Sequence, residues 1–285
     1  MAIYVNGMGG GIGQALWPVL SGLGAKRISG SPAGGDLICD LQNLLDTDGN
    51  WFRPGDVFIF PAAWSKPDQC RQDPGGAWLV NVENTGRLIE KALEKKTSVI
   101  FFSSDTVYGE QHCTLTENSQ LLATEEYGKM KAAIEKKFSS ASGFCALRLS
   151  YVTSLCDGVT RYFSDCASGG KTAEVFEGYE RNMVWIDDVV ATVCSLTEMA
   201  LCGDVLPKAV NVGGAECISR GQMAAAYVRA VDASLQYREV AAPENFFSSR
   251  PRKIALDVSL LTSILRRSPV SLDEGYGKYK GVLHG

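Results

Sequence analysis

The chain has little of what several classes of enzyme require. It holds two histidines in 285 residues, and one is next to last, so a Ser-His-Asp or metal-centred mechanism would depend on His112 alone. The nine cysteines form no Cys-x-x-Cys pair and are odd in number. They are typical of small buried apolar residues in a reducing compartment rather than of disulfides or zinc ligands. We therefore expect no metal site.

The chain also has no large excess of charge of either sign and no long apolar run. The net charge is −4 and no run of lysine and arginine appears, so a nucleic-acid partner is not expected. No apolar stretch approaches the roughly 20 residues that cross a bilayer, and Met1 leads into a strand without a basic leader or cleavage site. These absences predict a cytoplasmic protein with no membrane partner.

The first twenty residues read as a strand, a glycine turn and a helix. Ile3 to Val5 form the strand, and helical spacing runs from Ile12 to Leu20. Between them, Gly7, Gly10 and Gly13 have the spacing of a nucleotide-binding turn, in which glycines allow a tight turn, close approach of a pyrophosphate and helix–strand packing. Gly11 and Ile12 open the helix, whose free N–H groups and dipole favour phosphate.

Strands and helices continue to alternate up to about residue 151. Continuous apolar strands separated by helices predict a doubly wound parallel sheet of Rossmann type, whose ligands bind at the carboxyl ends of the strands. We place a dinucleotide-binding domain at 1–150 and a mainly substrate-binding cap at 151–285, with some segments returning to the first domain. The expected strands are 26–29, 36–39, 56–61, 98–103 and 145–151, and the expected helices are 78–95, 126–139 and 188–201, the last N-capped by Asp187-Asp188.

Tyr127 and Lys131 stand four residues apart and share one face of the helix predicted at 126–139. The lysine ammonium can then stabilise the ionised tyrosine and make the phenol a usable acid or base near neutral pH. An amphipathic surface helix is the alternative, because Met130, Ile134 and Phe138 alone would give it a core-facing stripe.

Together these segments resemble an extended short-chain dehydrogenase/reductase of the nucleotide-sugar epimerase, dehydratase and reductase group. The matching motifs are VNGMGGGIG, CDL at 39–41, FPAAW, VNVENT, FFSSDTVYG, EYGKMK, LRLSYV, RNMVWIDDVV, NVGG at 211–214 and SRPRKIALDVSLL. The resemblance implies that Ser104 hydrogen-bonds the substrate carbonyl, Tyr127 is the acid/base and Lys131 holds the nicotinamide ribose. The other residues it implies are Asp40 and Leu41 beside the adenine, Ala62 and Ala63 beside the pyrophosphate and ribose, Asn81 supporting the site, and Tyr151 at the cofactor.

The branch of the group is indicated by the loop after Ser104. Family dehydratases carry a glutamate where this chain has Thr106, next to Asp105, and that glutamate is the extra acid/base that removes water. The closing segment looks most like dTDP-4-dehydrorhamnose reductase-type enzymes, which implies NAD(P)H-dependent reduction of a nucleotide-linked keto sugar. Arg181 and Arg250 are implied at the sugar-nucleotide diphosphate, which suits their bidentate geometry, although a loop salt bridge is an alternative for Arg250.

Two other functions stay open, a UDP-sugar 4-epimerase and a noncatalytic NADP-binding regulatory subunit. An NAD site places an acid after the second strand, whereas this chain has Ser29-Gly30-Ser31 preceded by Lys26 and Arg27. We therefore expect NADPH as the cofactor, with Ser31 as a contact and NADH as the alternative. The expected partner is a nucleotide sugar, and a second copy of the chain in a homodimer is a further candidate.

Overall fold

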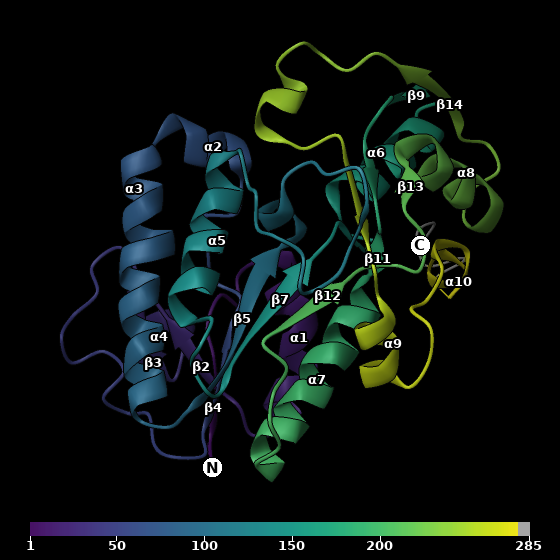
Figure 1. The fold of residues 1–285 in the computed structure, drawn as a ribbon. Helices are drawn as coiled ribbons and strands as arrows, with labels where there is room; N and C mark the ends of the chain where they lie inside the picture. Colours follow the sequence, from purple (N-terminus) through teal and green to yellow (C-terminus); the bar gives the residue numbers. More distant parts are fainter. Residues whose placement is uncertain (279–285) are drawn as a thin grey trace.

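The computed structural model describes residues 1–278. Its centre is a seven-stranded sheet in the order β12-β7-β5-β4-β1-β2-β3, with every neighbouring pair parallel (Figure 1). The order reverses between β1 and β4, which is where a doubly wound fold opens a crevice for ligands. The strands are β1 (Ile3–Val5), β2 (Lys26–Ser29), β3 (Leu37–Ile38), β4 (Val57–Phe60), β5 (Ser98–Ser104), β7 (Phe144–Leu149) and β12 (Ala209–Val212). The predicted fold class is confirmed.

Helices cover both faces of this sheet, as its continuous apolar strands require. Figure 1 shows α3, α4 and α5 on one face and α1, α7 and α9 on the other, and the buried side chains divide into one cluster on each side. The helices are α1 (Gly11–Gly22), α2 (Pro67–Gln72), α3 (Pro74–Trp78), α4 (Thr85–Glu94), α5 (Glu126–Phe138), α6 (Gly158–Ser168), α7 (Ile186–Cys202), α8 (Arg220–Ala230), α9 (Ser259–Leu265) and α10 (Leu272–Gly277).

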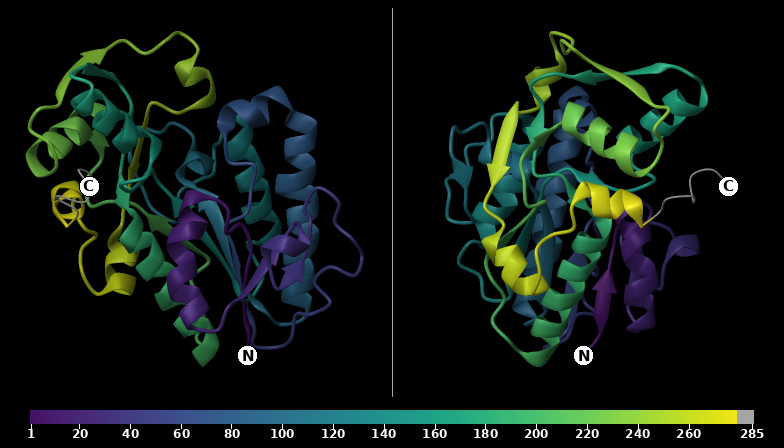
Figure 2. Two further views of the ribbon diagram at one scale, coloured as in Figure 1. Left: turned by 180° about the vertical axis from the view of Figure 1, so that it is seen from behind. Right: turned by 90° about the vertical axis from the view of Figure 1, so that its right-hand side faces the viewer.

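A smaller unit stands over the carboxyl end of the sheet and has its own core. That core includes Phe163, Trp185 and Tyr227, and Figure 2 shows its helices and short strands set beside the main sheet. The second half of the chain also contributes α7 and β12 to the main sheet layer. The short strands are β6 (Thr114–Leu115), β8 (Val152–Thr153), β9 (Thr172–Phe176), β10 (Glu180–Arg181), β11 (Val184–Trp185), β13 (Ile218–Ser219), β14 (Gln236–Val240) and β15 (Lys253–Leu256).

The glycine turn after β1 is tightly packed. Gly7 has φ +69°, and a Cβ there would lie 2.7 Å from the Ala62 nitrogen. A Cβ at Gly13 would lie 2.4 Å from the Gly7 carbonyl oxygen. Both positions therefore exclude any side chain, as the nucleotide-binding turn requires.

Two local expectations differ from the structure. The helix expected at 78–95 begins earlier, as α3, and reaches α4 through a π-helical turn at Leu79–Asn84. The Asp187-Asp188 cap is wrong, because Trp185 holds the cap position of α7 and makes no side-chain cap bond. Asp188 is instead fully buried, pairs with Arg267 and accepts the Val270 N–H at 2.7 Å, which fastens the C-terminal segment to the start of α7.

The cysteines also differ in part from the expectation. All nine are free, and Cys39, Cys70, Cys145 and Cys166 are buried as expected. Cys113, Cys156 and Cys202 are exposed.

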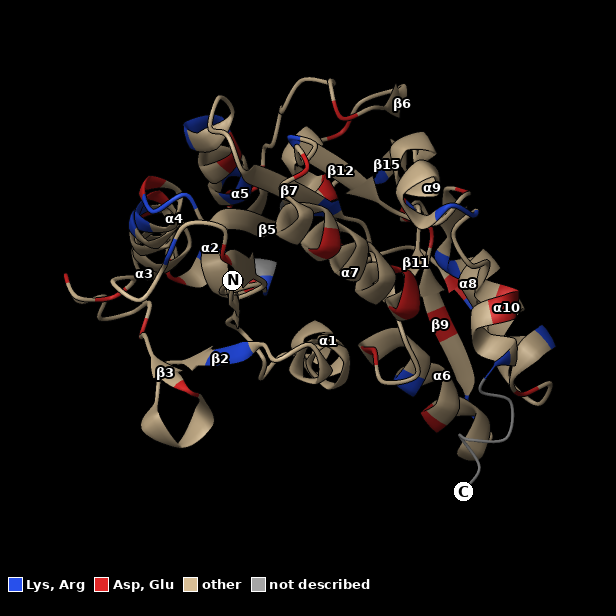
Figure 3. Ribbon diagram, turned by 90° about the horizontal axis from the view of Figure 1, so that it is seen from below, with Lys and Arg blue, Asp and Glu red and all other residues tan. Residues whose placement is uncertain are grey.

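Charged residues of both signs are interspersed along the same elements in Figure 3. Within residues 1–278, no helix is both long and apolar enough to cross a membrane, and no cluster of three or more His, Cys, Asp or Glu could hold a metal.

A buried polar network holds α5 on the sheet. Glu135 of α5 accepts from both Nε (2.9 Å) and Nη2 (2.7 Å) of Arg148 on β7, and it also accepts from the Ser103 hydroxyl on β5. Arg148 continues to the Tyr108 hydroxyl at 2.7 Å, and Tyr108 donates to Asn211 at 2.6 Å. Because both charges are almost fully buried, each one depends on the other.

We predict that Glu135→Gln lowers the free energy of unfolding by about 3 kcal/mol, because it leaves the Arg148 charge buried without its counter-ion. Urea unfolding measures this loss. Glu90→Gln is the matched control, since Glu90 forms an exposed pair with Lys137 and its loss should cost less than about 1 kcal/mol. Equal losses in the two variants would contradict the role of the network.

Candidate active site

The carboxyl edge of the sheet carries a pocket of about 320 Å³ at the switch point between β1 and β4. It is lined by glycines of the first turn, the ends of β2 and β4 and the segment after β3. Five of the predicted cofactor residues meet there, namely Gly7, Asp40, Leu41, Ala62 and Ala63. Gly10, Gly11, Ile12 and Gly13 lie at the adjoining start of α1, and Ser31 lies in the exposed segment after β2.

Local hydrogen bonds fix the walls of this pocket. Asn6 accepts the Ala62 N–H at 3.3 Å, which ties the end of β1 to the end of β4. The two carboxylate oxygens of Asp40 accept from Gln42 N and Asn43 Nδ2, both at 2.9 Å. The pocket is therefore formed by the chain's own contacts, and Arg27 borders it as a basic side chain.

Lys131 is buried on α5 against the end of β5. Its ammonium donates to the Phe102 carbonyl at 2.7 Å, and it lies 5.6 Å from the centroid of the Tyr127 ring. Burial disfavours the charged form and lowers the pKa of Lys131 from its ordinary 10.5 to about 7, against the pull of Glu135. The lysine can therefore change its protonation state near neutral pH.

The phenol of Tyr127 differs from the expectation. Burial, together with the nearby Cys70, Glu125 and Asp105, raises the pKa of Tyr127 above its ordinary range. The lysine was expected to lower it, but with its own charge weakened by burial it does not outweigh desolvation. Tyr127 therefore stays a neutral phenol at physiological pH.

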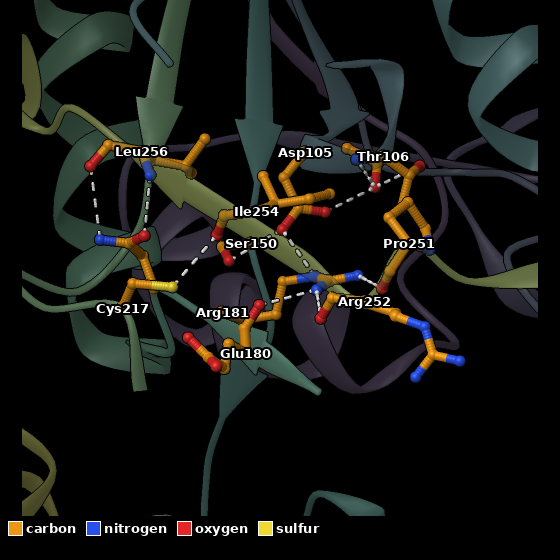
Figure 4. Close-up of polar contacts among 12 residues, drawn as sticks. Asp105, Thr106, Ser150, Glu180, Arg181, Cys217, Pro251, Arg252, Ile254 and Leu256 are labelled. Carbon is orange, nitrogen blue, oxygen red and sulfur yellow. Dashed lines mark hydrogen bonds and ion pairs between the residues drawn. The ribbon is translucent and has the colours of Figure 1, made fainter. Parts of the chain in front are cut away.

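The loop after β5 places three hydroxyl and carboxyl groups together. Ser104 Oγ accepts from the Thr106 amide at 3.3 Å and from the Thr106 hydroxyl at 3.0 Å. Asp105 is buried, accepts from the Ser150 hydroxyl at 2.9 Å and lies 3.4 Å from Nε of Arg181 (Figure 4). Burial raises the pKa of Asp105, and Arg181 opposes the rise.

The guanidinium of Arg181 is occupied by the chain itself. It donates to the carbonyls of Glu180, Pro251 and Arg252 at 2.6–3.0 Å, and its side chain is 2% exposed (Figure 4). Asp105 and Arg181 thus tie the sheet edge to the cap and present no exposed face to a diphosphate.

Arg250 and Tyr151 are only partly buried. Arg250 is 25% exposed, forms an ion pair with Asp68 at 2.9 Å, as the salt-bridge alternative has it, and borders a pocket with Lys66 and Gln69. The Tyr151 hydroxyl donates to Asp157 at 2.7 Å, and its ring lies 3.9 Å below the guanidinium carbon of Arg220.

The sequence does not predict two residues of the site, Arg220 and Glu125. Arg220 lies at the start of α8 and reaches Tyr151 only through the folding of the cap. Glu125 immediately precedes α5 and is buried beside Tyr127, although a glutamate two residues before the tyrosine looks like a surface charge in the sequence. The side chain of Asn81 bridges both backbone groups of Trp64, which lines the pocket, at 2.9 and 3.0 Å.

The fold and the motifs at this edge define an extended short-chain dehydrogenase/reductase. The family model described as "RmlD substrate binding domain" matches residues 1–272, and the chain belongs to that family. The resemblance stated from the sequence is therefore confirmed at the level of the family.

The individual proteins that the chain resembles share low sequence identity with it. The chain is 26% identical over 235 residues to methionine adenosyltransferase 2 subunit beta of Pongo abelii, covering 78% of this chain and 70% of the relative. Its fold is similar to a hypothetical dTDP-4-dehydrorhamnose reductase from Sulfolobus tokodaii, with TM-score 0.81, 21% identity and coverage of 96% and 99% of the two chains. It is also similar to UDP-glucose 4-epimerase of Thermus thermophilus in complex with NAD, with TM-score 0.80, 20% identity and coverage of 100% and 99%.

We predict that the stability of the chain rises with pH because of Lys131. Between its folded pKa of about 7 and its unfolded value of 10.5, the unfolded state holds a proton that the folded state lacks, so raising the pH favours folding. From pH 7 to 10 this should contribute about 2–4 kcal/mol. Urea unfolding measures the free energy of unfolding of the wild type and of Lys131→Met over this pH range. The contribution of Lys131 is the part of the rise that the substitution abolishes. Parallel pH profiles for the two proteins would show that the lysine is not buried in its neutral form.

Proposed function

We propose that the chain is an NAD(P)H-dependent oxidoreductase that reduces the C4 keto group of a nucleotide-linked deoxy sugar. The observation that carries the proposal is the packing of α5 on the end of β5. A Cβ at Gly128 would lie 2.7 Å from the Thr106 carbonyl oxygen, so the helix carrying Tyr127 and Lys131 contacts the loop carrying Ser104. The helix with the predicted acid and lysine therefore packs on the loop with the predicted hydroxyl, and Trp64 of the pocket wall packs in the same apolar cluster as Tyr127.

The protonation states suit reduction. The chemistry that a reduced nicotinamide supplies is hydride transfer. Tyr127, a neutral phenol, donates the proton that the developing alkoxide needs, and Ser104 donates a second hydrogen bond to the same oxygen. Lys131, with a pKa near 7, can replace the proton of the phenol and hold the ribose.

The residues present fit a dinucleotide. The turn at Gly7 and Gly13 excludes side chains, the start of α1 presents free N–H groups, and the pocket at the β1–β4 switch point has the place and lining that an adenosine needs. Similar structures are described in complex with NAD, and one of them also with UDP-glucose. A nucleotide sugar would then lie toward the cap, near Arg250 and Tyr151.

A regulatory role is the second candidate, because the curated relatives are named as beta subunits of methionine adenosyltransferase 2. The intact Ser104, Tyr127 and Lys131 set favours catalysis. An epimerase is less favoured than a reductase, because the closing segment and short cap resemble the keto-sugar reductases. Thr106 argues against a dehydratase.

We predict NADPH oxidation with at least one member of a panel of dTDP-, UDP- and GDP-4-keto-6-deoxy sugars. Tyr127→Phe should lower kcat at least about a hundredfold while NADPH affinity stays within a few-fold, since only the proton-donating hydroxyl is lost. The loss of absorbance at 340 nm measures turnover, and nicotinamide fluorescence measures affinity. A Tyr127→Phe variant with the wild-type rate would contradict the assignment. Silence on every substrate with cofactor still bound would select the regulatory role.

We also predict tighter binding of NADPH than of NADH. Arg27 borders the pocket, and both oxygens of Asp40, an acid of the pocket wall, already accept hydrogen bonds from Gln42 and Asn43. Arg27→Ala should reduce the preference roughly tenfold by weakening the affinity for NADPH alone, as expected for a single phosphate contact. Fluorescence titration with both cofactors measures it, and a wild-type preference for NADH would contradict the proposal.

A further inference from the structure

Glu125 is the N-cap residue of α5, and it is an unusual choice for that position. Its Oε1 accepts the Gly128 N–H at 2.6 Å. Serine, threonine, aspartate and asparagine make this bond with shorter side chains and are preferred at N-caps. Capping alone therefore does not explain a glutamate here.

The second oxygen of Glu125 is the feature that capping leaves unexplained. The residue is 7% exposed, and its Oε2 is buried without a hydrogen-bond partner in the part of the chain that the structure describes. Burial raises the pKa of this carboxyl, the Thr106 hydroxyl and the amides of Gly128 and Tyr127 counter the rise, and Asp105 adds to it. The titratable groups that face it are Cys70 from α2, Asp105 from the loop after β5 and Tyr127 from α5.

The carboxyl is close to the pair of hydroxyls at the end of β5. A Cβ at Gly128 would lie 2.3 Å from Glu125 Oε1 and 2.7 Å from the Thr106 carbonyl oxygen, so cap, helix and loop are in direct contact. Thr106 in turn donates its hydroxyl to Ser104 Oγ at 3.0 Å. The Thr106 hydroxyl interacts with the Glu125 carboxyl as well as with Ser104, so the three side chains form a row that leads from the helix cap to the end of β5.

We propose that Glu125 is a positioning residue that controls, through Thr106, the direction in which the Ser104 hydroxyl donates. A hydroxyl has one hydrogen to donate. When Glu125 is protonated it donates to Thr106 and Thr106 donates to Ser104. The Ser104 hydrogen, which points to Asp105 Oδ1 at 3.4 Å in this structure, can then turn to the substrate oxygen. When Glu125 is ionised it accepts from Thr106, Thr106 accepts from Ser104, and that hydrogen is turned away. The inference rests on the proposed reductase function. The switch takes up one proton from solvent when Glu125 becomes protonated and releases it when Glu125 ionises.

The test is the pH dependence of kcat in three variants. In the wild type kcat should fall as pH rises through the pKa of Glu125. Glu125→Gln keeps a neutral donor at every pH and should remove that limb. Glu125→Ser keeps the helix cap without the carboxyl, so the melting temperature and NADPH affinity should hold while kcat falls roughly tenfold, as for the loss of one hydrogen bond. Glu126→Gln, which removes only an exposed pair with Lys129, should match the wild type.

A Glu125→Ser variant with wild-type kcat and pH profile would reduce Glu125 to a cap and overturn the inference. A separate measurement decides the case if the wild type reduces no keto sugar. In the ¹³C-carboxyl NMR titration of the intact protein, the signal lost in Glu125→Gln should titrate above the ordinary glutamate range, and Thr106→Val should raise its pKa further. An ordinary pKa, or one that Thr106→Val leaves unchanged, would overturn the inference independently of the proposed function.

Discussion

The buried ion pair between Arg148 and Glu135 is the constraint on which the site depends. It joins β7 to α5 inside the protein, and Ser103 of β5 shares the same carboxylate. One turn earlier on α5, Lys131 donates to the Phe102 carbonyl of β5. The helix that carries Tyr127 is thus fixed to two adjacent strands by charged hydrogen bonds, which are directional in a way that apolar packing is not. These bonds determine how α5 is rotated about its axis and where it lies along that axis relative to Ser104.

The same burial that fixes the helix sets its chemistry. Desolvation lowers the pKa of Lys131 and raises those of Tyr127, Asp105 and Glu125, so the site holds a neutral phenol beside a lysine that titrates near pH 7. A neutral phenol is the form that donates a proton to a reduced carbonyl oxygen. The protonation states of these groups therefore suit the proposed reduction.

Patterns of short range predicted most of the fold, because apolar strands and the glycine turn are local signals. Lys26–Ser29 is a strand as expected, and Gly7 and Gly13 occupy positions that exclude a side chain. The sequence could not show which long polar side chains are fully occupied by contacts within the chain. Arg181 looks like a phosphate ligand, yet contacts made some 70 residues away bury it against Pro251 and Arg252. Glu125 looks like a surface charge, and only the packing of α5 on the loop after β5 buries it.

The central claim is that this edge of the sheet reduces a sugar ketone with a nicotinamide cofactor. Its most direct test is to supply NADPH deuterated at C4 of the nicotinamide together with nucleotide-linked 4-keto-6-deoxy sugars, and to weigh the sugar product by mass spectrometry. The account predicts a product carrying one deuterium at its former keto carbon, formed in proportion to the NADP⁺ released. Recovery of every sugar without deuterium, with the cofactor bound and unoxidised, would contradict it.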